Sequence, residues 1–366
     1  MPFDGQMVTV ADYEYYARQV TPPALYEFYY GEHGDPHWST ETSNRSAYHA
    51  VKLRPRVLID VTSRNLATTF LGHNLSLPVI VGPTGIVGDH DPQGEVPTAK
   101  AAGAEGTIMV LSGVSTSPVD DVAAAATGPW FQQVWILDDR DLTEWQIRRA
   151  VELGASAIVV TVSNSGETWR TPTLRFLGAA AKQPLGPATN LLHYESTKTP
   201  SLLDVTNSIS RATTWSDLDW VRSLTSTPII VKGIQTAEDA ELCVEHGIDA
   251  LVISNHGGRF LQGTRGTLEA LPEIVDAVGG RIEIAIDGGV RQGQDILKAL
   301  ALGAGTVWIG RAARWGATVG GEEGVRGVLN VLRTELDGSM GLCGVTDVND
   351  VSASLVTFAG IPTSEA

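Results

Sequence analysis

The chain has 366 residues, 43% of them hydrophobic and 19% charged, and its formal net charge at pH 7 is −16. This is the composition of a globular protein with a large core, and no segment is apolar over the ~20 residues that a membrane-spanning helix needs. The negative charge argues against a nucleic-acid partner, so an anionic ligand would need a local positive pocket. The start Met-Pro-Phe-Asp-Gly lacks the features of a signal peptide, which predicts a cytoplasmic protein whose two cysteines pack in the fold.

Residues 1–75 predict an N-terminal arm ahead of the regular part of the chain. Helical spacing of apolar residues predicts helices around Val10–Gln19 and Pro23–Tyr30. We expect Leu53–Leu58 to add a strand that closes the bottom of the fold.

From about residue 76 onward, short β-branched apolar runs alternate with segments of helical spacing. The runs predict strands at Leu77–Val81, Thr107–Leu111, Trp130–Val134, Ala157–Val162, Pro228–Val231, Ala250–Ile253, Glu283–Ile286 and Thr306–Ile309. The segments between and after them predict helices such as Leu142–Leu153, Ala237–His246, Leu268–Val278, Gln294–Leu302 and Gly324–Leu336. Eight strands that alternate with helices are typical of a TIM (β/α)8 barrel, an α/β fold whose active site lies at the C-terminal ends of the strands. The length would also allow two domains, but such barrels commonly form one, and we expect a single domain over residues 1–366.

Residues 163–213 break this alternation after the fourth strand. The segment is too long for an ordinary loop between strand and helix, and it is rich in Ser, Thr, Pro and Gly. We predict a lid loop over the active site, with a disordered insertion of no consequence as the alternative.

The turn Ser254-Asn255-His256-Gly257-Gly258-Arg259 directly follows the sixth predicted strand. It places a titratable base, His256, three residues from a fixed cation, Arg259. A base and a guanidinium that holds a carboxylate suit chemistry at the carbon next to that carboxylate. The alternative is a His and an Arg in an ordinary glycine-rich surface turn.

Glycine-rich turns that contain arginines follow the last two strands, as Asp287-Gly288-Gly289-Val290-Arg291 and Gly310-Arg311. In a TIM barrel the loops after strands seven and eight are the usual phosphate site, and each turn opens a helix whose N-terminus favours an anion. These turns predict a phosphorylated cofactor or substrate, with tight surface turns as the alternative.

Lys232 ends the fifth strand and is expected to point into the mouth of the barrel.

Together these motifs resemble the family of FMN-dependent 2-hydroxy acid oxidases and dehydrogenases, which includes glycolate oxidase, lactate oxidase and mandelate dehydrogenase. The resemblance runs from Val10 to about Gly344. Its six ordered anchors are Arg54–Val61, Gly82–Gly85, Val231–Gly233, Ser254–Arg259, Asp287–Arg291 and Lys298–Ala304.

The resemblance implies FMN as the cofactor and assigns its contacts. One face of the flavin would lie against Pro83, Thr84 and Gly85. Groups around the ring would be Ser112, Gln133 (with Gln132 as the less favoured owner of that contact), Thr161, Lys232 and Ser254. The ribityl and phosphate groups would be held by Asp287, Gly289, Arg291, Gly310 and Arg311.

The resemblance also implies the catalytic roles. His256 would remove the substrate's proton, Arg259 would bind the substrate carboxylate, and the charge of Lys232 would raise the oxidising power of the flavin. Arg170 falls where a lid arginine of the family assists with the carboxylate.

Three positions depart from the family pattern. Two active-site tyrosines correspond to Phe28 and Trp135, and the aspartate that ordinarily pairs with the catalytic His corresponds to Ser163. Without that carboxylate we expect a weaker base, because the imidazolium loses its main stabiliser. Phe28, Trp135 and Trp169 predict an aromatic pocket for an aryl or bulky acid, unless the tryptophans only cover the underside of the lid.

The leading hypothesis is an FMN-dependent oxidoreductase that acts on a 2-hydroxy acid or related 2-substituted acid and passes a hydride equivalent to flavin N5. Two alternatives remain open: an FMN-dependent monooxygenase or oxidative decarboxylase in which molecular oxygen takes part, and a catalytically silent flavin-binding protein. The resemblance implies a homo-oligomer, most simply a tetramer, and no metal site is expected.

Overall fold

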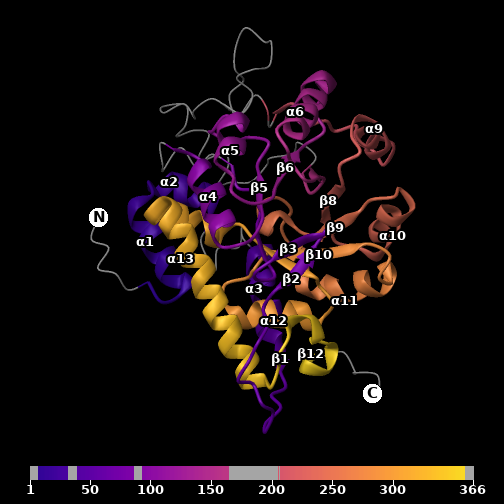
Figure 1. Cartoon of the computed structure of the whole chain (residues 1–366). Helices are drawn as coiled ribbons and strands as arrows, with labels where there is room; N and C mark the ends of the chain where they lie inside the picture. Colours follow the sequence, from indigo (N-terminus) through magenta and orange to yellow (C-terminus); the bar gives the residue numbers. More distant parts are fainter. Residues whose placement is uncertain (1–6, 32–38, 86–92, 165–204, 206, 359–366) are drawn as a thin grey trace.

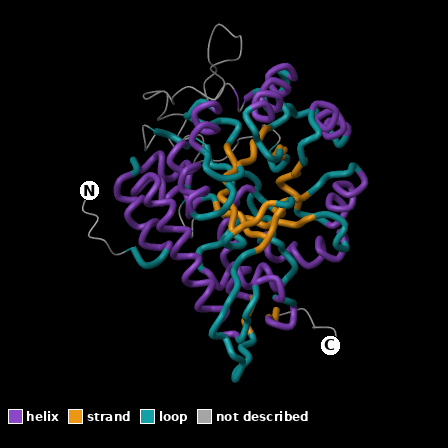
Figure 2. The backbone as a smooth tube through the Cα atoms, viewed as in Figure 1, coloured by secondary structure: helices purple, strands orange, loops and turns teal. Residues whose placement is uncertain are grey.

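A closed barrel of eight parallel strands forms the centre of the protein, in the spatial order β10-β11-β4-β5-β6-β7-β8-β9. The computed structural model describes residues 7–31, 39–85, 93–164, 205 and 207–358. The barrel strands are β4 (Val79–Val81), β5 (Met109–Leu111), β6 (Trp130–Val134), β7 (Ile158–Thr161), β8 (Ile229–Ile234), β9 (Ala250–Ile253), β10 (Glu283–Asp287) and β11 (Thr306–Ile309). Each overlaps a strand predicted from the sequence, so the prediction of a TIM barrel is confirmed. Figure 2 shows these strands in orange at the centre, with helices around them.

The strands are continuous apolar runs because both of their faces are buried. Side chains such as Ile80, Phe131 and Trp308 point inward and fill the barrel. Their neighbours, such as Val79 and Val81, pack outward against the surrounding helices. The barrel is therefore a packed core, and ligands must bind at its ends.

Helices follow the strands in turn. In the described part of the chain these are α4 (Val96–Ala104), α5 (Val119–Ala125), α6 (Arg140–Glu152), α9 (Ser216–Leu224), α10 (Ala237–Glu245), α11 (Thr267–Val278), α12 (Gly293–Ala301) and α13 (Arg311–Cys343). α13 spans 33 residues, but Gly320 and Gly321 leave helical geometry inside it, so it consists of two helical segments joined at a kink. The sequence predicted the second segment, as Gly324–Leu336, and missed the first.

The N-terminal arm consists of α1 (Val10–Val20), α2 (Pro23–Tyr29) and α3 (Ser39–Ala50). The first two match their predictions, and Figure 1 shows α1 alongside α13. The third was not predicted, because its sequence is rich in Ser and Thr, which are weak helix formers. It is stabilised by its buried face, which includes Asn44, Ala47 and Tyr48.

The prediction that Leu53–Leu58 is a strand that closes the bottom of the barrel was wrong. The strand there is β1 (Val51–Leu53), which pairs antiparallel with β12 (Val356–Phe358), and residues 54–58 are not part of a strand. The bottom is covered by the hairpin of β2 (Thr68–Phe70) and β3 (His73–Leu75). Phe70 and Leu75 of this hairpin join the interior cluster of the barrel, and the Leu71 N–H donates to the carboxylate of Glu283, the first residue of β10.

Short 3-10 turns at Val348–Asp350 and Ala353–Leu355 lead from α13 to β12. Among the described residues, no helix is both long enough and apolar enough to cross a membrane.

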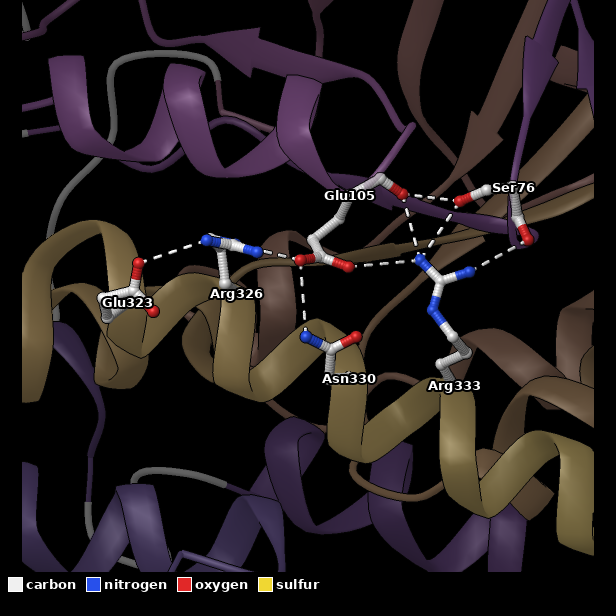
Figure 3. Close-up of polar contacts among 6 residues, drawn as sticks. All are labelled: Ser76, Glu105, Glu323, Arg326, Asn330 and Arg333. Atoms are coloured by element: carbon white, nitrogen blue, oxygen red, sulfur yellow. Dashed lines mark hydrogen bonds and ion pairs between the residues drawn. The ribbon is translucent and has the colours of Figure 1, made fainter. Parts of the chain in front are cut away.

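A polar network joins α13 to the bottom of the barrel (Figure 3). The carboxylate of Glu105, at the end of α4, pairs with Arg326 at 3.0 Å and with Arg333 at 3.4 Å. Arg333 also donates to the carbonyl oxygens of Ser76 at 3.2 Å and of Glu105 at 3.0 Å. Ser76 and Glu105 precede β4 and β5, so the network lies at the N-terminal ends of the strands, where side chains serve stability.

We expect Glu105→Gln to lower the melting temperature by a few degrees, because two arginines lose their carboxylate partner. Glu323→Gln is a matched control, since Glu323 pairs only with Arg326 in this network and is 79% exposed. Differential scanning calorimetry should show a decrease for the first variant and none for the second. Equal melting temperatures for the two variants would mean that the buried carboxylate does not stabilise the fold.

Candidate active site at the C-terminal end of the barrel

The predicted base lies in a short 3-10 turn, His256–Gly258, directly after β9. The backbone N–H of His256 donates to the hydroxyl of Ser254 at 3.1 Å. The Nδ1 atom of His256 lies 2.9 Å from the Ser163 hydroxyl, which follows β7. Phe260 packs edge-on against the imidazole, with ring centroids 4.7 Å apart. The structure thus brings Ser163 to His256, where the family resemblance placed an aspartate.

Lys232 lies on β8 and is buried at the mouth of the barrel. Its ammonium donates to the Ser254 hydroxyl at 2.8 Å and pairs with the Asp287 carboxylate at 2.5 Å. The second carboxylate oxygen of Asp287 is buried and has no hydrogen-bond partner among the described residues. Residues assigned from three separate strand ends therefore meet in one polar cluster.

Arginines gather at this end of the barrel in a protein of negative net charge. Burial lowers the pKa of Arg259 and of Arg291 to about 10, and it also lowers the pKa of Arg311. Arg311 and Arg314 further depress the pKa of Arg259 by charge repulsion. Guanidinium groups stay protonated in proteins, so this cluster of arginines favours an anion, as do the N-termini of α12 and α13.

Arg291 contacts both an acid and an aromatic ring. Its guanidinium lies 3.7 Å from the Glu41 carboxylate and 4.7 Å from the ring centroid of Trp315. Its Nε atom is buried and has no hydrogen-bond partner among the described residues. A further anion at this guanidinium would satisfy that atom.

The other positions predicted to contact the cofactor lie at the same end of the barrel. Ser112, Gln133 and Thr161 are buried at the ends of β5, β6 and β7. Gln133 accepts from the Gly113 N–H at 2.8 Å, while its Nε2 atom is buried and has no partner in the described part of the chain. Gln132 instead donates to the Gln133 carbonyl at 2.7 Å.

The turns predicted to surround the cofactor also meet at this end. Pro83, Thr84 and Gly85 follow β4, and the methyl group of Thr84 faces Gly310. Gly289, at a φ of 89°, packs against the backbone of α3. Orphaned polar atoms on Gln133, Asp287 and Arg291 together with the half-buried arginines fit a ligand that has both a polar ring and a phosphate.

Trp135 is the one residue of the predicted aromatic pocket whose side chain belongs to the described part of the chain. Trp135 follows β6 and is 8% exposed, and its indole N–H has no partner among the described residues. Arg170, Trp169 and most of the predicted lid lie outside the described residues, and so does the side chain of Phe28.

Sequence reasoning missed several residues of this site. Arg314, one helical turn after Arg311, donates to the Gly85 carbonyl, and its guanidinium lies 3.6 Å from the ring centroid of Tyr29. A buried arginine in the apolar run Ala312-Ala313-Arg314-Trp315 was the signal for it. The side chain of Asn44 in α3 forms a hydrogen bond with the side chain of Asn255. No local sequence pattern predicts this contact, because 211 positions separate the two residues.

The comparisons with known proteins agree with this geometry. The sequence profile of the FMN-dependent dehydrogenase family matches residues 17–358. Glycolate oxidase 3 of Oryza sativa subsp. indica is 39% identical over 361 residues, which cover 96% of each chain. Glycolate oxidase of Spinacia oleracea is 39% identical over 360 residues, which cover 95% of each.

Solved structures show the same likeness. A soluble mutant of the membrane-associated (S)-mandelate dehydrogenase from Pseudomonas putida superposes with a TM-score of 0.87 at 29% identity, covering 96% of this chain and 100% of that one. A mandelate oxidase variant with 2-hydroxy-phenylacetamide gives a TM-score of 0.83 at 32% identity, covering 96% and 98%. The chain therefore belongs to the FMN-dependent dehydrogenase family, as an enzyme of the 2-hydroxy acid oxidase and dehydrogenase type whose cofactor is FMN.

Proposed function

We propose that this enzyme oxidises an aryl or otherwise bulky 2-hydroxy acid, with His256 as the base and Arg259 as the carboxylate anchor. The observation that carries the proposal is the half-buried Arg259 three residues from His256, in a turn that also contacts Ser163 and Lys232 through Ser254. A fixed cation beside a base is the arrangement that orients an acid for proton removal at the adjacent carbon.

The chain's own residues divide the work as follows. Arg259 holds the substrate carboxylate, and His256 takes a proton from the hydroxyl or the α-carbon at Nε2, since its Nδ1 contacts Ser163. Lys232, which Ser254 and Asp287 hold in place, would present its ammonium group to the flavin ring, and Arg291 and Arg311 would hold the phosphate. FMN, when bound, supplies the oxidant that accepts the hydride equivalent. Arg170 and Phe28 remain proposed substrate contacts from the sequence.

The preference for a bulky substrate rests on two supports. Trp135 places an indole beside the site, with a buried N–H that a polar substituent of the substrate could meet. The similar solved structures include a mandelate oxidase mutant with (S)-mandelic acid. Anaerobic stopped-flow spectrophotometry with mandelate, lactate and glycolate tests the proposal. The flavin should bleach fastest with mandelate, and faster bleaching with glycolate would contradict a bulky substrate.

The same measurements address the alternatives. A product that has gained an oxygen atom or lost carbon dioxide, as seen by mass spectrometry, would indicate a monooxygenase or an oxidative decarboxylase. A flavin that no 2-hydroxy acid bleaches would indicate a catalytically silent protein.

We further propose that the protein is a cytoplasmic homotetramer. Cys243 and Cys343 are buried and unpaired, which is compatible with a reducing compartment, and light scattering would test the tetramer.

Ser163→Asp is expected to raise the rate of flavin reduction by mandelate roughly tenfold. A carboxylate beside Nδ1 would stabilise the imidazolium that forms on proton removal, which a neutral hydroxyl 2.9 Å away does weakly. Ser163→Asn provides a control of the same shape without charge, and it should give no increase. A slower reduction by the Asp variant would mean that the pocket is adapted to serine for another reaction.

A further inference from the structure

The backbone of the turn that carries His256 has an unfavourable conformation. His256, Gly257 and Gly258 have φ values of 56°, 66° and 73°. Glycine adopts this left-handed region readily, but a residue with a β-carbon rarely does. Contacts that orient the turn therefore help to hold His256 in place.

These contacts come from helix α3 of the N-terminal arm. Asn44 and Asn255 exchange two hydrogen bonds between their side-chain amides, each 2.8 Å long. The Oδ1 atom of Asn255 also accepts from the Gly258 N–H at 3.1 Å and so closes the turn. The Oδ1 atom of Asn44 accepts from the Thr267 N–H at 3.1 Å. These backbone donors fix the orientation of both amides, and both residues are buried.

Asn44 also lies against the turn that is proposed to hold the cofactor. A β-carbon added to Gly288 would come 3.1 Å from the side-chain nitrogen Nδ2 of Asn44. One added to Gly289 would come 2.7 Å from the backbone carbonyl oxygen of Asn44. A β-carbon added to Gly258 would meet the backbone nitrogen of Glu41 at 2.4 Å. Helix α3 thus packs directly on the two turns that follow β9 and β10.

We propose that Asn44 is a positioning residue for the base. Through Asn255 it holds the turn in the conformation in which His256 Nδ1 meets the Ser163 hydroxyl. Asn44 itself contacts neither substrate nor the reacting atoms. The inference rests on the proposed function, in which His256 removes the proton.

Asn44→Ala should slow flavin reduction about 10- to 100-fold, because a small misplacement of a catalytic group has an effect of that size. The dissociation constant of FMN should change much less than the rate. Asn255→Ala should give a similar loss, and the double variant should lose little more than either single one, since the two residues act as a pair. Asn44→Ser is a milder variant in case Asn44→Ala folds poorly.

The deciding measurement repeats Asn44→Ala in a His256→Ala background. If Asn44 acts through His256, Asn44→Ala should cause no further loss of the residual rate in the His256→Ala background.

Ala47→Gly is the control for a general loss of stability, because it weakens the same helix and leaves the two asparagines in place. It should lower the melting temperature of the holoenzyme and leave the reduction rate unchanged.

Two results would overturn the positioning role: a reduction rate of Asn44→Ala within twofold of the parent, or an equal loss with and without His256. If His256→Ala alone reduced the flavin at the parent rate, the proposed function would fail, and the role of Asn44 with it. A large effect of His256→Ala beside a null effect of Asn44→Ala would reject only the inference about Asn44.

Discussion

His256→Ala is expected to slow flavin reduction by about 10²- to 10⁴-fold, which is the usual contribution of a positioned general base. The variant should still bind FMN, because the imidazole contacts Ser163 and Phe260, whereas the phosphate is proposed to bind at Arg291 and Arg311. Anaerobic stopped-flow reduction with mandelate measures the rate, and the flavin absorbance of the purified protein measures FMN content.

The chain offers a matched control for this variant in His246. That residue stacks on Trp215 and pairs with Asp219 at 3.0 Å, close to the end of α10 and away from the turn after β9. His246→Ala should leave the reduction rate unchanged. A His256 variant that reduced its flavin at the parent rate would require another base.

Arg291→Ala should weaken FMN binding about 10- to 150-fold, the equivalent of losing one charge-assisted hydrogen bond of about 1.5–3 kcal/mol. Burial holds the pKa of this arginine at about 10, so it carries a desolvated charge that a phosphate would compensate. Its loss would also leave the nearby Glu41 carboxylate to repel the anion. Fluorescence titration of FMN into the apoprotein gives the two dissociation constants.

Arg281 serves as the control, since it forms a surface pair with Glu241 at 2.7 Å and is 46% exposed. Arg281→Ala should bind FMN as tightly as the parent. Equal affinities for the Arg291 and Arg281 variants would remove Arg291 from the phosphate site.

The barrel could be predicted because each of its strands is buried on both faces and so appears as a short β-branched run between helical segments. Helix α3 could not, since its Ser- and Thr-rich sequence has weak helix propensity and forms through tertiary packing. The error at Leu53–Leu58 has a different cause, because apolar residues there suggested a buried strand. Val57 and Leu58 are in fact 78% and 103% exposed, and the hairpin β2–β3 covers the barrel instead.

Part of the candidate site could likewise be predicted from the sequence, and part of it could not. Strand ends and glycine-rich turns pointed to His256, Lys232 and the arginines, because in a parallel barrel all strand ends converge on one face. The asparagine pair and Arg314 could not be assigned in this way. Their importance depends on which side chains meet in space, and a single sequence does not record such contacts.

The contact between Asn44 and Asn255 has a consequence for the order of folding. Residue 44 is synthesised long before residue 255, and the barrel closes only when β11 pairs with β4. Contacts so distant along the chain carry a high entropic cost and form late. We therefore expect the N-terminal arm of the nascent chain to remain undocked from the barrel until most of the chain has left the ribosome. The turn that carries His256 would then gain its contacts with helix α3 only after the barrel has closed.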